Sequence, residues 1–286
     1  DIFLFTCTPL LKISNIITIS LDHNNVYQIT HENNIEEEQQ MVKSGGDFHK
    51  IYEDMIIEGF NLKIESGLFD DQTIKEILDI DFQAIKEILP LKKYEQLKET
   101  LTIWINIETI STPTVSGHGA CFHPNADWLK ENNMNPKKVE CIEIYNVKDY
   151  LKERKRWGHG GLILHELCHA FHFTCCENGY DNTIILSAYN QAIGKKNLYK
   201  DIEMRIIDSE GSSDEVQVKK ITTPVAYCCT NCMEFFAEIS VAYLGGLNDS
   251  EEYNSHFPFN RSQVLSYDPD TYSIMEQLWN SALSIE

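Results

Sequence analysis

The sequence has 286 residues, of which 42% are hydrophobic, and it carries a formal net charge of −20. This length and composition predict a soluble globular chain with a sizeable core, organised as one domain plus an extension. The strongly acidic balance argues against a nucleic-acid partner, because phosphate recognition needs a positive surface.

The first 46 residues are predicted to form an extension and an acidic linker. The sequence begins with Asp1, which indicates a processed or truncated chain. Residues 2–20 are apolar but interrupted by polar side chains, which predicts neither a membrane span nor an intact signal peptide. A pair of strands and the remnant of a targeting segment are both compatible with that run. Residues 31–46 are polar and acidic and end in two glycines, as is typical of a linker.

Residues 47–286 are predicted to form one α+β domain. Alternating and β-branched apolar residues predict strands at 60–65, 101–108 and 141–145. Helical spacing of apolar residues predicts helices at 72–89, 161–173, 182–193, 231–243 and 270–284. A charged stretch at 209–214 is expected to be an exposed loop or a hairpin tip. We therefore expect a small mixed sheet packed on the helix at 161–173, followed by a helix-rich C-terminal portion.

The helix predicted at 161–173 contains the most informative motif of the chain, His165-Glu166-Leu167-Cys168-His169. A spacing of four places the two imidazoles on one helix face, one turn apart, where they can bind a single Zn²⁺. Glu166 lies beside the first histidine and can act as a general base on a water at the metal. A third ligand is needed to complete such a site.

The position of the third ligand separates the classes of zinc peptidase. A metzincin-type site needs a glycine and a third histidine where this chain has His172 and Cys175. The alternative is a glutamate from a later helix. The helix predicted at 231–243 carries Glu234 and Glu238 on one face, and either could bind the metal while the other orients a histidine. Two carboxylates on an otherwise apolar helix are costly to bury unless a cation lies opposite them.

The combined pattern resembles a known family. His165-Glu166-x-x-His169, Tyr227 and a glutamate seven residues after that tyrosine are similar to the anthrax lethal factor-like zinc metallopeptidases, which include the bacterial Pro-Pro endopeptidases. Further similar segments lie at 122–129, 227–245 and 257–279. The resemblance covers residues 55–280 with gaps and does not extend to the first 45 residues.

The resemblance implies a zincin-like fold and hydrolysis of peptide bonds in a peptide or protein substrate. It implies that His165, His169 and Glu234 hold one Zn²⁺. It further implies that Glu166 is the general base and that Tyr227 stabilises the oxyanion. The alternative is a zincin-like domain that serves as a catalytically inactive binding module, although all five of these chemical groups are present.

Glu238 is implied to lie outside the ligand set, where it orients a ligating histidine. The chain departs from the family pattern mainly in its cysteines. We expect Cys168, inside the motif, to be a small buried apolar residue. For Cys228, Cys229 and Cys232, packing or disulfide use is favoured over a separate metal site, because no second well-spaced pair is present.

Three further histidines have two interpretations each. His172 could act around the metal or the substrate, or it could be a hydrogen-bonded histidine near the end of the helix. His118 and His123 precede that helix, in a segment where a strand could bind an extended peptide at a sheet edge. For these two histidines, turn and packing roles are favoured.

The compartment is only weakly indicated. Nine cysteines are an odd count, and sequons at Asn248 and Asn260 permit secretion without requiring it. We expect a secreted protein, with a cytoplasmic one as the alternative. The acidic surface could steer basic peptides to a site or simply keep the chain in solution.

Overall fold

The computed structural model describes residues 18–21, 27–30, 47–108, 119–208, 217–246 and 251–280. The chain divides into two units, residues 1–44 and 45–286. The described part of the first unit is an antiparallel hairpin of β1 (Thr18–Leu21) and β2 (Tyr27–Thr30). Most of the apolar run at 2–20 lies outside the described residues.

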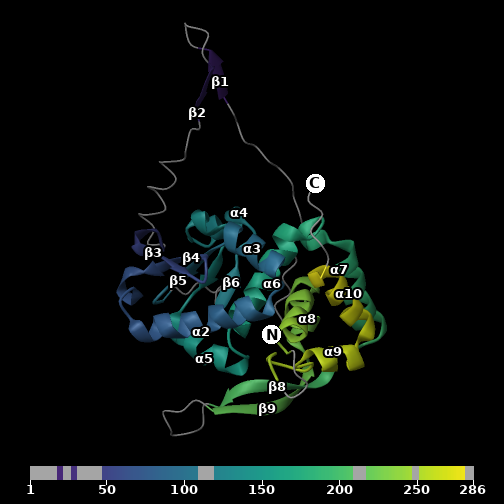
Figure 1. Cartoon of the computed structure of the whole chain (residues 1–286). Helices are drawn as coiled ribbons and strands as arrows, with labels where there is room; N and C mark the ends of the chain where they lie inside the picture. The colour runs from purple at the N-terminus through teal and green to yellow at the C-terminus, as the bar shows by residue number, and fades with distance from the viewer. Residues whose placement is uncertain are drawn as a thin grey trace. The chain divides into compact units, whose positions relative to one another are not determined.

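A five-stranded mixed sheet forms one side of the second unit (Figure 1). Its strands are β3 (Tyr52–Ile57), β4 (Phe60–Glu65), β5 (Thr102–Ile105), β6 (Ala120–Phe122) and β7 (Ile142–Ile144). They lie in the order β3-β4-β5-β7-β6, with β4, β5 and β7 parallel and the outer strands antiparallel to their neighbours. The predicted α+β class with a small mixed sheet is confirmed. The strand expected at 101–108 is shorter than predicted, and β3 was not predicted.

The register of the sheet sorts its side chains into an apolar face and a polar face, because successive residues of a strand point to opposite sides. One row across the sheet lies in the main core and consists of Leu62, Ile103, Ile142 and Phe122. The adjacent row, on the other face, consists of Lys63, Trp104, Glu143 and Cys121. The apolar face contacts helices, whereas the polar face buries charged groups.

Two helices connect β4 to β5 and contact the sheet. α2 (Gln72–Ile88) begins at Asp71, whose carboxylate accepts a hydrogen bond from the backbone N–H of Ile74 at 3.1 Å. The helix predicted at 72–89 is therefore confirmed. α3 (Leu91–Thr100) follows directly after Pro90, which ends α2 but is harmless at a helix start, where no N–H partner is needed. α3 was not predicted.

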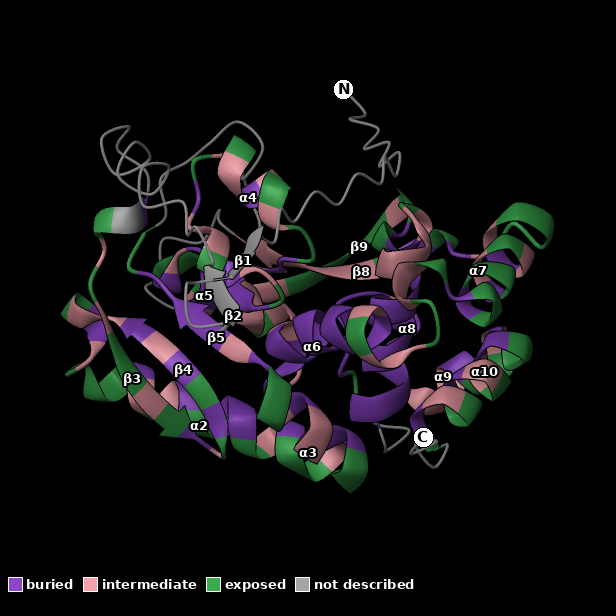
Figure 2. Ribbon diagram, turned by 90° about the horizontal axis from the view of Figure 1, so that it is seen from above, coloured by how far each residue is buried: buried purple, intermediate pink, exposed green. Residues whose placement is uncertain are grey.

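α6 (Gly161–Cys175) is the buried central helix and carries the HExxH motif (Figure 2). It begins after Gly160, which has φ +73°, and a Cβ there would lie 2.4 Å from the backbone oxygen of Asp81. Only glycine is tolerated at this position. The N–H of Gly160 donates to the carboxylate of Asp81 at 2.8 Å, and Arg154 donates to the same carboxylate at 2.7 Å. Asp81 therefore fixes the start of α6 against α2.

α8 (Cys232–Gly245) packs directly against α6 (Figure 2). It begins at Asn231, whose side chain accepts hydrogen bonds from the N–H groups of Met233 and Glu234, both at 2.9 Å. The helix predicted at 231–243 is confirmed. Its other neighbours include α7 (Thr183–Tyr189), α9 (Arg261–Tyr267) and α10 (Pro269–Asn280). α7 continues as the π-helix η6 (Asn190–Lys195).

The remaining elements are short or peripheral. They are β8 (Lys200–Asp208), β9 (Gln217–Val225), α4 (Ala126–Glu131), α5 (Val147–Glu153), η1 (Asp47–His49), η2 (Ser66–Leu68), η3 (Pro136–Lys138), η4 (Arg154–Arg156), η5 (Gly179–Asp181) and η7 (Tyr227–Cys229). β8 and β9 pair as a hairpin, but the loop expected at 209–214 lies outside the described residues, as do 281–284 of the last predicted helix. Within the described ranges, no helix is long and apolar enough to cross a membrane.

Candidate metal centre

His165 and His169 point the same way from α6, as their spacing predicts. Their rings meet edge to face with centroids 4.7 Å apart, and their Nε2 atoms are 3.0 Å apart. Both side chains are buried, in a helix whose other faces are apolar. Two imidazole nitrogens therefore converge on one point inside the domain.

Glu234, in the first turn of α8, brings a carboxylate oxygen to the same point. Its Oε2 lies 3.2 Å from Nε2 of His165 and 3.2 Å from Nε2 of His169. Within the described part of the chain, this is the one group of three His, Cys, Asp or Glu side chains close enough to share a metal ion. We call these three atoms the metal triangle.

The dimensions of the metal triangle fit a tetrahedral zinc ion. With metal–ligand bonds of about 2.0–2.1 Å, two ligand atoms of a tetrahedral zinc lie about 3.3 Å apart. The three distances here are 3.0 to 3.2 Å. Two imidazoles and one carboxylate leave the fourth position open, which is typical of catalytic rather than structural zinc sites.

Hydrogen bonding among neutral histidines does not account for the triangle. Nδ1 of His165 lies 3.2 Å from Oε1 of Glu238, and this negative charge favours a ring proton on Nδ1, which leaves a lone pair on Nε2. That lone pair faces the carboxylate of Glu234, which has only lone pairs when ionised. Two acceptors at this separation need a cation between them, either a proton or a metal ion.

The carboxylates of the site remain charged although they are largely buried. Burial raises the pKa of Glu234, but His169 and His165 outweigh it and hold that pKa well below its usual value. Burial likewise opposes ionisation of Glu238, but His256 and His165 lower its pKa to about 2. Burial disfavours a charged His165, yet Glu234 and Glu238 raise its pKa well above 6.5. The site therefore has a negative field that attracts a cation.

Glu166 lies on the side of α6 that faces β6. Its Oε2 accepts a hydrogen bond from the backbone N–H of Phe122 at 2.9 Å, which holds the buried carboxylate in place. The backbone groups of Gly119 and His123, which flank β6, form hydrogen bonds with backbone groups that flank β7. The backbone groups of Ala120 and Phe122 therefore point away from β7, and both residues are buried.

Tyr227 borders the metal triangle from η7, the turn that packs against the start of α8. Its ring lies 6.4 Å from the ring of His165 and is tilted by 37° to it, and 44% of the residue is exposed. Partial burial and the carboxylates of Glu234 and Glu166 raise the pKa of Tyr227. The phenol therefore keeps its proton and can donate a hydrogen bond beside the triangle.

His172 and Cys168 lie deeper in α6. His172 is fully buried, and neither ring nitrogen has a hydrogen-bond partner among the described residues, so the hydrogen-bonded histidine that was one interpretation is not observed there. Its ring packs against Tyr180 and Phe236, with centroids 5.0 Å from each. Burial and the charge of His169 lower its pKa to about 3, which keeps the imidazole neutral. Cys168 lies in the main core and is not part of the triangle.

Other residues that the sequence singled out contribute nothing to the triangle. The eight cysteines in the described part of the chain are free thiols, so disulfide use is not observed there. His118 and Asn248 lie outside the described residues. Asn260 is only 1% exposed, and its side chain caps α9 by accepting the N–H of Gln263 at 3.0 Å. A glycan on Asn260 has no room in the folded domain.

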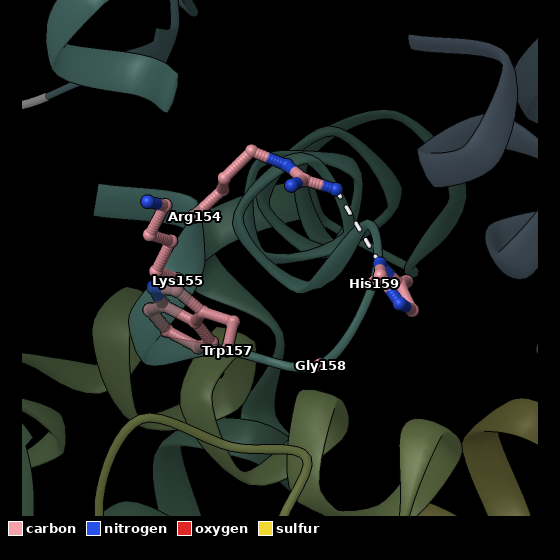
Figure 3. Close-up of a pocket in the computed structure, with 5 residues that line it drawn as sticks. All are labelled: Arg154, Lys155, Trp157, Gly158 and His159. Atoms are coloured by element: carbon pink, nitrogen blue, oxygen red, sulfur yellow. Dashed lines mark hydrogen bonds between the residues drawn. The ribbon is translucent and has the colours of Figure 1, made fainter. Parts of the chain in front are cut away.

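A separate hollow lies where the chain enters α6 (Figure 3). It is lined by Arg154, Lys155, Trp157, Gly158 and His159. Arg154 is already paired with Asp81, and its guanidinium lies 3.4 Å from Nδ1 of His159. The ring of Trp157 packs edge-on against His165, at 5.7 Å. The hollow therefore adjoins a residue of the metal triangle but contains none of the three ligand atoms.

His256 is the residue at the site that the sequence did not indicate. It is 3% exposed, and its Nε2 lies 2.6 Å from Oε2 of Glu238. No spacing or periodicity marks it, because the contact depends on the path of the irregular segment at 251–260. The backbone N–H of Phe122 that binds Glu166 was equally invisible in the sequence.

The structure thus gathers all the residues predicted for the site: His165, Glu166, His169, Tyr227, Glu234 and Glu238. No family model, curated protein or solved structure matches the chain. The function must therefore be inferred from the geometry of these residues.

Proposed function

We propose that the chain is a zinc-dependent metalloendopeptidase with a zincin-like catalytic domain. The observation that carries this proposal is the metal triangle, in which two imidazole nitrogens and a carboxylate oxygen lie 3.0 to 3.2 Å apart. The ligands come from α6 and α8, and the HExxH glutamate follows the first of them. This combination supports a hydrolytic site rather than a structural one.

His165, His169 and Glu234 would hold the ion. Zinc, when bound, supplies a Lewis acid that makes a water more acidic and polarises the scissile carbonyl. The carboxylate of Glu238 lies 3.2 Å from Nδ1 of His165, where its charge would favour a proton on Nδ1 and leave the Nε2 lone pair directed into the triangle.

Glu166 would transfer the proton, and Tyr227 would stabilise the developing negative charge. Glu166 takes a proton from the attacking water and later delivers it to the leaving amine as the C–N bond breaks. The bond from the N–H of Phe122 holds its carboxylate in position during both transfers. Tyr227 keeps its phenolic proton and donates a hydrogen bond to the oxyanion that forms on the carbonyl oxygen.

The substrate is a peptide or protein in an extended conformation. β6 is the last strand of the sheet and contacts α6, so an extended chain that paired with β6 would run beside that helix. Because Phe122 also binds Glu166, this strand leads directly to the proposed base. A preference for proline near the scissile bond follows from the family resemblance alone.

The test is digestion of a mixed peptide library by the zinc-loaded chain, read by mass spectrometry. Wild type is compared with Glu166→Gln, and Glu177→Gln, an exposed glutamate just beyond α6, serves as the matched control. We expect the same cuts from wild type and Glu177→Gln, and none from Glu166→Gln, which should still bind zinc. An uncut library with zinc-loaded wild type would contradict the proposal and favour the catalytically inactive binding module. Identical cuts from all three proteins would assign the cleavage to a contaminant.

A further inference from the structure

His256 lies at the end of a chain of contacts that begins in the metal triangle. Nδ1 of His165 is 3.2 Å from Oε1 of Glu238, and Oε2 of Glu238 is 2.6 Å from Nε2 of His256. Nδ1 of His256 lies 3.1 Å from the backbone oxygen of Phe257. Glu238 is 2% exposed and His256 is 3% exposed, so protein groups rather than bulk water make these contacts.

The backbone that carries His256 is held from both sides. The residues before and after it form hydrogen bonds to β8, at 2.7 and 2.8 Å. Within the segment, the side chain of Asn254 donates to the carbonyl of His256 at 3.1 Å, and Asn254 is itself fully buried. The direction of the imidazole is therefore set by the fold and not by the contact with Glu238 alone.

The His256–Glu238 pair also has a purely structural interpretation, because a buried carboxylate needs a partner wherever it lies. The sheet contains a comparable pair, in which Nε2 of His123 lies 2.8 Å from Glu143 and both side chains are buried. Neither residue of that pair is in a described contact with a proposed metal ligand. The difference between the two pairs is that the second oxygen of Glu238 contacts His165, a member of the triangle.

We propose that His256 is a positioning residue for the metal. By holding one oxygen of Glu238, it keeps the other oxygen close to Nδ1 of His165 and so favours the tautomer whose Nε2 lone pair faces the triangle. The inference rests on the metal site of the proposed function but needs no hydrolysis. Outer partners of ligating histidines typically change metal affinity by about 10–100-fold, and His256 is one step further out. We therefore expect about a tenfold effect, at the lower end of that range.

The test measures zinc affinity by competition with a chromophoric chelator, together with thermal unfolding of the metal-free full chain. His256→Leu removes the contact, and His256→Gln retains a hydrogen-bond donor without the charge. His123→Gln is the matched control, because it breaks the comparable pair on the sheet. We expect about tenfold weaker zinc binding in His256→Leu, a smaller loss in His256→Gln, and no change in His123→Gln. In a Glu238→Gln background, His256→Leu should add no further loss.

Unchanged zinc affinity in both His256 variants would overturn the inference, as would a loss that persists in the Glu238→Gln background. If His256→Leu does not fold, His256→Gln completes the same comparison. Zinc binding that depends on His256 in a chain that cuts no peptide would support the inference while refuting the peptidase. Peptide cleavage together with zinc binding that does not depend on His256 would support the peptidase and refute the inference.

Discussion

Protonation of Glu143 is expected to destabilise the domain at acid pH. This glutamate is fully buried on the polar face of the sheet. Its carboxylate contacts Nζ of Lys138 at 2.6 Å, Nδ2 of Asn106 at 2.7 Å and Nε2 of His123 at 2.8 Å. Burial alone would raise the pKa of Glu143, but His123 and Lys138 lower it to about 2.

The lowered pKa gives both the sign and the size of the effect. The ordinary value for glutamate is 4.5, so the folded pKa lies below the unfolded one. The stabilisation from Glu143 is therefore complete above the unfolded pKa and is lost as the pH falls through the folded pKa. A difference of about 2.5 between the two pKa values corresponds to about 3 kcal/mol at pH 7 and to less than half of that at pH 3.

Urea unfolding of wild type and Glu143→Gln at pH 7, 5, 4 and 3 measures this contribution. The two free energies of unfolding should differ by about 3 kcal/mol at pH 7, and the difference should narrow to about 1 kcal/mol at pH 3. Lys138 still has Asp47 as a partner in the variant. Glu53→Gln changes an exposed position of β3, and the difference between its free energy of unfolding and that of wild type should not narrow as the pH falls. A difference between wild type and Glu143→Gln that stays constant from pH 7 to pH 3 would refute the reasoning.

Three further substitutions test the site and its surroundings. Glu234→Ala is expected to weaken zinc binding by about 100-fold or more, beyond the range of outer partners; wild-type affinity in a chelator competition would remove Glu234 from the ligand set. Tyr227→Phe should lower kcat by about 100-fold with unchanged zinc affinity, because one oxyanion donor is lost; an unchanged kcat would exclude that role. His172→Leu should raise the free energy of unfolding by about 1 kcal/mol in a denaturant titration, because two buried ring nitrogens without described partners are removed. A large loss of stability would show that a bound water forms hydrogen bonds with the ring nitrogens of His172.

The features that were predicted from the sequence are those set by short-range geometry. The spacing of His165 and His169 fixes a shared helix face wherever the helix lies in the domain. The helices predicted at 72–89 and 231–243 begin at Asp71 and Asn231, whose side chains accept hydrogen bonds from N–H groups only two or three residues away. Glu234 and Glu238 share a face for the same reason as the histidines, so a second helix directed at the first could be expected before the fold was known.

The features that were missed depend on contacts between distant segments. α3 has a highly charged sequence, and it is helical because Tyr94 and Leu97 are buried in the main core. The polar face of the sheet was not foreseen, because Lys138 and Glu143 look like surface residues until the strands are paired. His256 contacts Glu238 only because β8 holds its segment in place. No local pattern in the sequence encodes these contacts.

The two buried clusters differ in how their charges are balanced. On the sheet, Glu143 and Asp47 share Lys138, a permanent cation, so the protein itself supplies the positive charge. At the metal triangle, Glu234 and Glu238 lie against histidines, and no Lys or Arg pairs with either carboxylate among the described residues. Their charge must be balanced by protons on imidazoles or by a bound cation. Because a ligating imidazole must be neutral, a divalent ion balances both carboxylates and leaves every ring nitrogen of the triangle available as a ligand.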